Sequence, residues 1–263
     1  MPISGGEHGA VAAAVTTTGP ARAGRATGAG APALRPRHRA TGRHRPWLVT
    51  WLRVAFRPVF RGLLRMRVDG QAHVPGSGGV IVAGNHTGVL DGPLVWLYLP
   101  RPARFLTKAE LYAHPFLGRA LGGLGQIPVH RGEPDRAALA EALAVLAAGG
   151  VVGVFPEGTR GTGMLSQVHD GVAYLAVKSG CPVVPVACLG SDRALSPGGR
   201  PRLRAPVTLS FGSPVTVVAA GAVRNRRTVT AASEEIRAAL VGHLAASARR
   251  AGEPVAPTGE VPS

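Results

Sequence analysis

A histidine and an aspartate five residues apart form the first pair in this chain that could do acid–base chemistry. His86 and Asp91 lie in the segment NHTGVLD, directly after a short apolar run. A loop that turns into a helix here can fold the Asp91 carboxylate back onto one imidazole nitrogen, which fixes the tautomer and stabilises the imidazolium. The other nitrogen is then free to take a proton from a substrate hydroxyl. The spacing predicts a general base, His86, and its partner, Asp91; a capped helix beside a surface histidine is the alternative.

The sequence shows no nucleophile to accompany this pair. No Gly-x-Ser-x-Gly segment precedes a predicted helix, and in one large group of hydrolases such a segment carries the nucleophilic serine. Neither Cys181 nor Cys188 lies in a predicted loop beside a basic residue, and both suit buried positions in a strand. We therefore predict that an activated substrate hydroxyl attacks directly, without a covalent enzyme intermediate.

A second candidate site is the segment FPEGTR, residues 155–160. It follows the apolar run VVGV, so it should reach the same edge of a sheet as the histidine. Arg160 can bind a phosphate through its planar guanidinium, and Thr159 and the backbone near Gly158 can donate further hydrogen bonds. Glu157 can orient either the acceptor substrate or the arginine. A surface turn with a salt bridge is the alternative.

Arg131 is a second candidate for binding phosphate. It ends the segment GQIPVHR and follows a short apolar stretch at 126–129. A guanidinium at the end of a strand can donate two parallel hydrogen bonds to a phosphate. Taken alone, a solvent-facing arginine is the alternative.

The elements that must position these residues alternate between apolar strands and helices. Such alternation is typical of a sheet covered by helices, so we predict an α/β fold. It is a single domain, residues 68–250, with a mixed, largely parallel central sheet flanked by helices and preceded by an amphipathic interfacial helical motif. The expected strands are 79–83, 103–107, 126–129, 151–155, 182–189 and 207–211, and the expected helices are 91–99, 135–148, 171–179 and 231–250.

Residues 44–67 form an amphipathic segment of a different kind. Arg53 begins a series of four arginines spaced four residues apart, which places them in one sector of a helix. Apolar side chains occupy the opposite side, with two tryptophans near the start. Such a helix is typical of a membrane interface, and Pro58 predicts two short helices or one kinked helix. An ordinary helix packed on the domain, with its arginines in water, is the alternative.

Positive charge is concentrated at the N-terminal end of the chain. The net charge is +16, and residues 1–67 hold twelve arginines against one acidic residue, Glu7. A basic arm of this kind indicates an anionic partner, either a membrane or a nucleic acid. Residues 1–43 and 251–263 lack the apolar periodicity that a core requires, so we predict two disordered tails, the first of them basic.

If this protein meets a membrane, we expect it to lie on the surface and not to cross the bilayer. No apolar run reaches the roughly 18 residues needed to cross a bilayer, and the N-terminus lacks the pattern of a signal peptide. Two cysteines in 263 residues make no disulfide framework and show no metal-ligand spacing. We expect a peripheral, monotopic protein on the cytoplasmic face of the cell membrane. No nucleic-acid partner is expected, because no nucleic-acid fold signature is recognisable; a non-enzymatic basic module that binds membrane or nucleic acid is an alternative of another class.

Taken in order, these segments resemble the motifs of the glycerolipid acyltransferase family, which includes the 1-acylglycerol-3-phosphate acyltransferases. NHTGVLD matches the first motif, Asn-His-x4-Asp, and FPEGTR matches the third at every position. These two matches together are highly specific. Residues 127–131 match the second motif in outline, and residues 183–186, around Pro185, match the fourth.

The resemblance implies an O-acyltransferase. Its reaction would move a fatty acyl group from acyl-CoA or acyl-carrier protein to the free hydroxyl of 1-acylglycerol 3-phosphate, a lysophospholipid, giving phosphatidic acid. His86 would be the base and Asp91 its partner, with neither a cofactor nor a metal required. The implied substrate-binding residues are Asn85, Arg131, Glu157, Gly158, Thr159, Arg160 and Pro185, the last of which would line the acyl or acceptor pocket.

Two departures from the family pattern leave the acceptor open. Asp170 precedes a glycine at which the family often has a basic pair, and His130 adds a titratable group beside the second motif. An aspartate that pointed toward a phosphate would repel it. The same chemistry on glycerol 3-phosphate, on another lysophospholipid or on a specialised lipid hydroxyl is therefore the nearest alternative.

Overall fold

The computed structural model describes residues 46–130, 135–157, 165, 170–196, 199–217 and 226–253. The predicted basic tail, 1–43, and most of the predicted C-terminal tail, 251–263, lie outside the described residues. So do four of the predicted substrate-binding residues. These four are Arg131, Gly158, Thr159 and Arg160.

Seven strands form one sheet in the order β1-β7-β6-β2-β5-β3-β4. Neighbouring strands are parallel except β6 and β7, which are antiparallel. The sheet is therefore mixed and largely parallel, as predicted. The strands are β1 (Arg65–Asp69), β2 (Val80–Gly84), β3 (Ala103–Lys108), β4 (Ile127–Val129), β5 (Val151–Val154), β6 (Val183–Leu189) and β7 (Pro206–Phe211).

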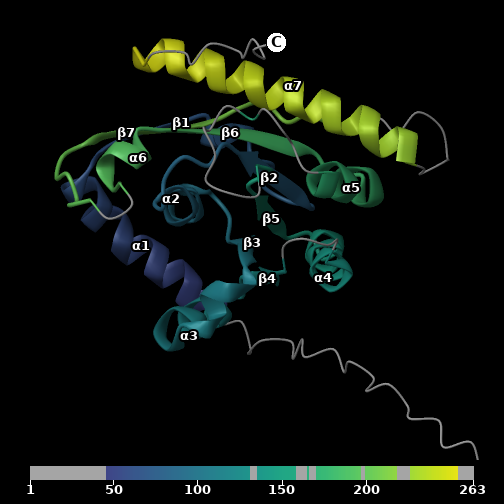
Figure 1. The fold of residues 1–263 in the computed structure, drawn as a ribbon, viewed down its shortest axis with the longest axis horizontal. Helices are drawn as coiled ribbons and strands as arrows, with labels where there is room; N and C mark the ends of the chain where they lie inside the picture. Colours follow the sequence, from purple (N-terminus) through teal and green to yellow (C-terminus); the bar gives the residue numbers. More distant parts are fainter. Residues whose placement is uncertain are drawn as a thin grey trace, which may run out of the picture. The chain divides into compact units, whose positions relative to one another are not determined.

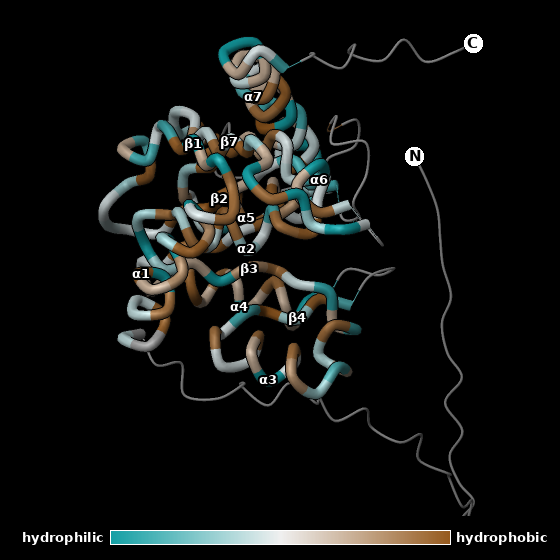
Figure 2. Tube along the Cα trace, turned by 90° about the vertical axis from the view of Figure 1, so that its left-hand side faces the viewer, coloured by the Kyte–Doolittle hydropathy of each residue, from teal (hydrophilic) through white to brown (hydrophobic). Residues whose placement is uncertain are grey.

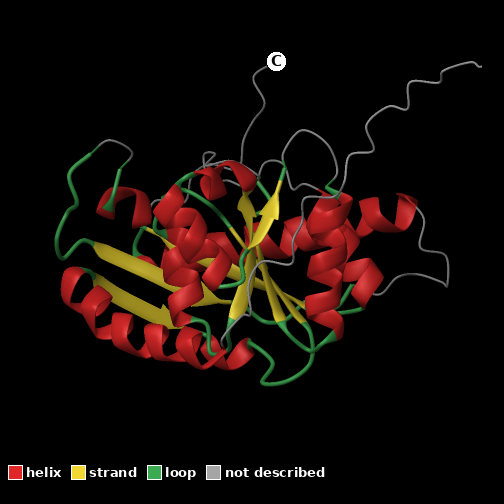
Figure 3. Ribbon diagram, turned by 90° about the horizontal axis from the view of Figure 1, so that it is seen from below, coloured by secondary structure: helices red, strands yellow, loops and turns green. Residues whose placement is uncertain are grey.

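Helices cover both faces of this sheet (Figures 1 and 3). One apolar core lies between the sheet and α2, with the end of α1 beside it. The other lies between the sheet and helices α4, α5 and α7. The helices are α1 (Pro46–Leu63), α2 (Asp91–Tyr98), α3 (Pro115–Gly123), α4 (Arg136–Ala147), α5 (Asp170–Ser179), α6 (Ser191–Ala194) and α7 (Arg226–Ala251), with short 3-10 turns at Gln71–His73 and Ala109–Ala113.

Three central strands, β2, β5 and β6, end at the same edge of the sheet. β2 and β5 are buried at every position, which is why each appears in the sequence as a continuous apolar run rather than an alternating one. β6 is buried except at its last residue and lies beside β2 in parallel. Because β2, β5 and β6 are parallel, the loops after all three meet at the same edge of the sheet.

The amphipathic segment differs from its prediction at its C-terminal end. Helix α1 runs without interruption from Pro46 to Leu63 and contains Pro58. The predicted helical span to residue 67 is too long, because Arg65–Asp69 is strand β1, paired in parallel with β7. The alternating exposure of β1 follows a two-residue period, and its half-buried positions, Met66 and Val68, pack against the core.

Two arginines of α1, Arg53 and Arg57, face the domain, whereas Arg61 is exposed. Arg57 donates hydrogen bonds to the carbonyl oxygens of Leu97 (3.0 Å) and Leu99 (3.2 Å), at the C-terminal end of α2, where a positive charge is favourable. Arg53 is buried and lies over the ring of Trp96. Burial, and secondarily the charge of Arg57, lowers the pKa of Arg53 to about 10, so its guanidinium is still charged at neutral pH.

The outward side of α1 is apolar as a consequence. Trp47, Trp51 and Val54 are each more than half exposed, at 58%, 67% and 55%. Within the described part of the chain, no helix has the length and apolar character needed to cross a membrane. We call the following six residues the apolar face of α1: Trp47, Trp51, Val54, Phe56, Val59 and Leu63.

Candidate active site

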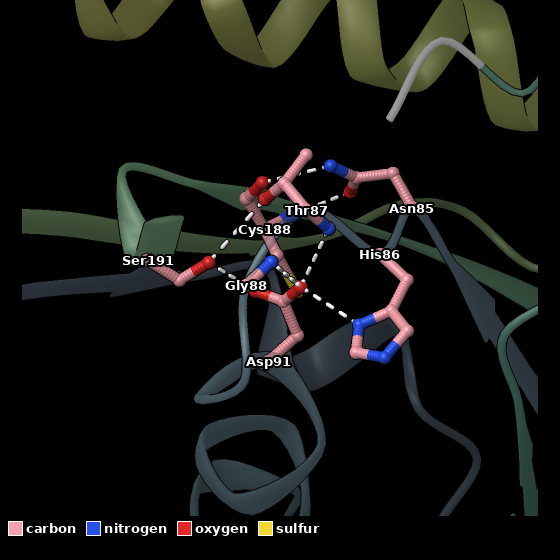
Figure 4. Close-up of polar contacts among 7 residues, drawn as sticks. All are labelled: Asn85, His86, Thr87, Gly88, Asp91, Cys188 and Ser191. Carbon is pink, nitrogen blue, oxygen red and sulfur yellow. Dashed lines mark hydrogen bonds and ion pairs between the residues drawn. The ribbon is translucent and has the colours of Figure 1, made fainter. Parts of the chain in front are cut away.

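His86 and Asp91 meet as their spacing predicts (Figure 4). The loop after β2 carries His86, and Asp91 begins α2. The Nδ1 atom of His86 lies 3.0 Å from Oδ2 of Asp91. Since a carboxylate only accepts hydrogen bonds, Nδ1 carries the proton and donates it, which leaves the lone pair of Nε2 free. Nε2 points away from Asp91 in Figure 4, and the side chain of His86 is 19% exposed.

The carboxylate of Asp91 is fully buried and surrounded by hydrogen-bond donors. Its Oδ2 also accepts the backbone N–H groups of Thr87 (2.8 Å) and Gly88 (2.7 Å). Its Oδ1 accepts the hydroxyl of Ser191. These donors fix the orientation of the carboxylate, and a carboxylate held against a histidine can stabilise its imidazolium.

Asn85 holds the loop to the neighbouring strand β6. Its side-chain amide donates to the carbonyl oxygen of Cys188 at 2.9 Å and accepts the backbone N–H of the same residue at 2.8 Å. The residue is 2% exposed. Asn85 was predicted to bind substrate, whereas this geometry directs both ends of its amide to the backbone of β6. It supports the loop that carries His86.

Cys188 is unsuited to act as a nucleophile. It is buried within β6. Burial, and secondarily the nearby negative charge of Asp91, raises the pKa of the Cys188 thiol well above its ordinary value. The thiolate is the reactive form of cysteine, so this residue stays protonated and inert beside the dyad of His86 and Asp91.

The ring of Phe155 packs against the face of the His86 imidazole. Phe155 follows β5 directly, and its ring stacks on that of His86 with centroids 4.5 Å apart and planes 24° apart. Phe105 of β3 stacks in turn on Phe155 at 5.7 Å. A side chain at Gly153 would overlap the ring of Phe105, so this glycine makes room for the stack. Two contacts, Asp91 at the edge and Phe155 at the face, thus fix the imidazole.

The structure describes two further predicted site residues, Glu157 and Pro185. Oε1 of Glu157 accepts the backbone N–H of Leu165 at 2.5 Å, and Leu165 is buried in the core beneath α4 and α5. This hydrogen bond joins Glu157 to the core residue Leu165. Pro185 is buried within β6, opposite Ala83 of β2 in the parallel register. It is therefore a residue of the central sheet.

Two contributors were missed from the sequence, Ser191 and Phe155. Ser191 follows β6, and β6 lies beside β2, so a polar residue at the end of a parallel neighbour was the available signal. That signal becomes usable only when the strand order is known. Phe155 belongs to the FPEGTR segment. Nothing in this local sequence pattern indicates that its ring stacks on a histidine 69 positions earlier.

The sequence of this chain is similar to those of known acyltransferases. A family model described as Acyltransferase matches residues 65–189, which include the dyad, Phe155, Glu157 and all of β6. A 1-acyl-sn-glycerol-3-phosphate acyltransferase of Borreliella burgdorferi is 35% identical over 133 residues, which are 49% of this chain and 53% of that protein. A protein of the same name from Bacillus subtilis is 28% identical over 141 residues, covering 52% of this chain and 70% of that protein.

A solved structure shares the fold. The crystal structure of the 1-acyl-sn-glycerophosphate acyltransferase PlsC from Thermotoga maritima matches with a TM-score of 0.56 and 26% sequence identity, over 75% of this chain and 80% of that one. The matching region of this chain spans about half the length of the first of the curated relatives, 53%. The family model, residues 65–189, covers the dyad and the described strands other than β7.

Proposed function

We propose that this chain is a member of the glycerolipid acyltransferase family, and that it transfers a fatty acyl group to the free hydroxyl of 1-acylglycerol 3-phosphate, giving phosphatidic acid. The observation that carries the proposal is the dyad. Nδ1 of His86 is held by buried Asp91 at 3.0 Å, and Nε2 is left free as a base. The names of the relatives support the acceptor.

In the proposed reaction, Nε2 of His86 takes the proton of the acceptor hydroxyl as its oxygen attacks the carbonyl carbon of an acyl thioester. Asp91 stabilises the imidazolium that forms. The tetrahedral intermediate then collapses, its C–S bond breaks, and His86 returns the proton to the departing thiolate. The products are the new ester and the free thiol of coenzyme A or of acyl-carrier protein, either of which would serve as the acyl donor.

We propose that Arg131 and Arg160 bind the phosphate of the acceptor, as the sequence predicts. Removing that phosphate should then reduce kcat/KM by about a hundredfold or more, since hydrogen bonds to charged groups are each worth about 1.5–3 kcal/mol. The measurement is thiol release from oleoyl-CoA with 1-oleoylglycerol 3-phosphate and with 1-oleoylglycerol. Equal rates with both would refute phosphate recognition and favour a lipid hydroxyl that lacks phosphate.

The same assay separates the remaining acceptors. Glycerol 3-phosphate and lysophospholipids with larger head groups keep a phosphate but change what surrounds it. A preference for 1-acylglycerol 3-phosphate over all of these supports the proposal. If another acceptor were preferred, His86 would remain the proposed base, but the proposed product would change.

We propose that the enzyme works as a peripheral protein on the cytoplasmic face of the membrane, attached through the apolar face of α1. The six residues of this face are exposed, and the arginines at 53 and 57 point to the domain. The proposed contact is therefore apolar, and Arg53 and Arg57 take no part in it. Phe116 of α3 is also exposed, at 78%, and α3 lies toward the same end of the domain as the N-terminal end of α1 (Figures 1 and 2).

Replacing Trp47 and Trp51 together with serine should reduce binding to phospholipid vesicles by about tenfold or more, because each side chain loses about 1.5–3 kcal/mol of apolar burial. The measurement is vesicle co-sedimentation of the wild type and the double variant. The control is activity on detergent-dispersed substrate, which should be unchanged, since both residues lie outside the dyad and its supports. Unaltered vesicle binding would show that this face is not the attachment surface.

A further inference from the structure

Ser191 reaches the site from a distant part of the chain. It begins α6, directly after β6 and the left-handed Gly190, whose φ is 80°. Side chains do not fit at position 190, because a Cβ there would overlap the carbonyl oxygen of Pro206. This tight turn buries Ser191 completely and directs its hydroxyl to Oδ1 of Asp91, 100 positions earlier in the sequence.

The close approach of α6 to the dyad depends on a second glycine. A Cβ at Gly88 would lie 2.6 Å from Oγ of Ser191, which is too close for two unbonded atoms. The hydroxyl of Thr87 also lies 3.4 Å from the Ser191 oxygen. The loop that carries His86 is thus shaped to receive Ser191, and Figure 4 shows the serine on the side of Asp91 away from the histidine.

The two carboxylate oxygens of Asp91 are held in different ways. Oδ2 accepts three donors, all from the loop at positions 86–88. For Oδ1, the donor that the structure gives is Ser191. A buried carboxylate oxygen without a donor costs about 1–3 kcal/mol, so loss of the hydroxyl favours rotation or displacement of the carboxylate. Either movement would change the direction in which His86 presents Nε2.

We propose that Ser191 is a positioning residue, which acts on the reaction by holding the orientation of Asp91 and, through it, of His86. The inference rests on the proposed function and deepens it, because it assigns a role in the same site to a residue outside its sequence motifs. Ser191 does not contact the reacting atoms. Its effect is therefore expected on the chemical step and not on acceptor binding.

The test compares Ser191→Ala, Ser191→Cys, Asp91→Asn and the combination of Ser191→Ala with Asp91→Asn. Ser191→Ala should lower kcat by about tenfold, the worth of a hydrogen bond to a charged group, with KM within about twofold. Ser191→Cys should lower kcat similarly, because a thiol fills the space but donates weakly. In the Asp91→Asn background, Ser191→Ala should cost little more, since its route of action is already lost.

A measurement without turnover separates this inference from the proposed function. The Nδ1 proton of His86, bonded to a carboxylate, should give a downfield proton resonance in the NMR spectrum that is absent from His86→Ala. Ser191→Ala should shift or broaden it. Wild-type kcat and an unchanged resonance in Ser191→Ala would overturn the inference, as would equal fold-losses of kcat in the wild-type and Asp91→Asn backgrounds. A wild type that transfers no acyl group refutes the proposed function, and the resonance still decides the role of Ser191.

Discussion

Replacing His86 with alanine is expected to reduce kcat by about 10²- to 10⁴-fold, the usual contribution of a general base. The variant removes the atom that takes the hydroxyl proton, Nε2, and no other described side chain is held by Asp91 and Phe155 together. The fold should survive, because His86 is a partly exposed loop residue outside the apolar cores. The measurements are steady-state kinetics and circular dichroism of both proteins.

The matched control for this variant is His114→Ala. His114 is exposed and precedes α3, so its loss changes the number of histidines without touching the dyad. Its kcat should remain within about twofold of the wild type, as surface substitutions usually have small effects. Near-normal turnover by His86→Ala, or equal losses in the two variants, would show that His86 is not the base.

Replacing Asp91 with asparagine is expected to lower kcat by about 10²- to 10⁴-fold, as the equivalent change does in a catalytic triad. The amide carries no charge, so the imidazolium of His86 loses its stabilising partner. Both oxygens of Asp91 accept hydrogen bonds. The asparagine side chain replaces one of these oxygens with an NH₂ group, which is itself a donor. One buried donor then lacks an acceptor, which should lower the free energy of unfolding by about 1–3 kcal/mol. Urea denaturation measures this second effect.

Asp192→Asn is the control for charge alone. Asp192 is an exposed carboxylate next to Ser191 in α6, so its substitution removes one negative charge near the site without changing the hydrogen bonds of Asp91. Both kcat and the denaturation midpoint should stay close to those of the wild type. If Asp91→Asn behaved like Asp192→Asn, the buried carboxylate would not be the partner of His86.

Much of the sheet could be predicted because its central strands are buried on both faces. β2, β5 and β6 are continuous apolar runs, and that composition needs no tertiary information to recognise. The dyad was predictable for a similar reason. Its two members lie within five residues on one loop and one helix end, so local geometry is enough to bring them together.

The support of the dyad depends on strand order and could not be predicted. Ser191 and Cys188 reach the site because β6 lies beside β2, a neighbour relation formed by segments about 100 residues apart. The local pattern around Ser191, a short polar stretch after a strand, is the same as that of an ordinary surface turn. Asn85 also binds the backbone of β6, a contact that its place in the local sequence pattern does not indicate.

The orientation of helix α1 could not be predicted from the periodicity of its sequence either. The four-residue spacing of its arginines places them in one sector, but a sector has no preferred direction until its neighbour is known. The C-terminal end of α2 supplies carbonyl acceptors for Arg57, and Trp96 covers Arg53. These contacts turn Arg53 and Arg57 inward and the apolar side outward, the reverse of a helix that packs its apolar side on a domain.

The most direct test of the central claim is the acceptor dependence of thiol release by the wild-type protein, with phosphatidic acid measured in the same sample. Oleoyl-CoA and 1-oleoylglycerol 3-phosphate are supplied in detergent, together and separately. Attack by a hydroxyl activated at His86 predicts equal amounts of thiol and phosphatidic acid, and no thiol above background without the acceptor. Thiol release without the acceptor, or an oleoyl group bound covalently to the protein, would contradict direct transfer by the dyad.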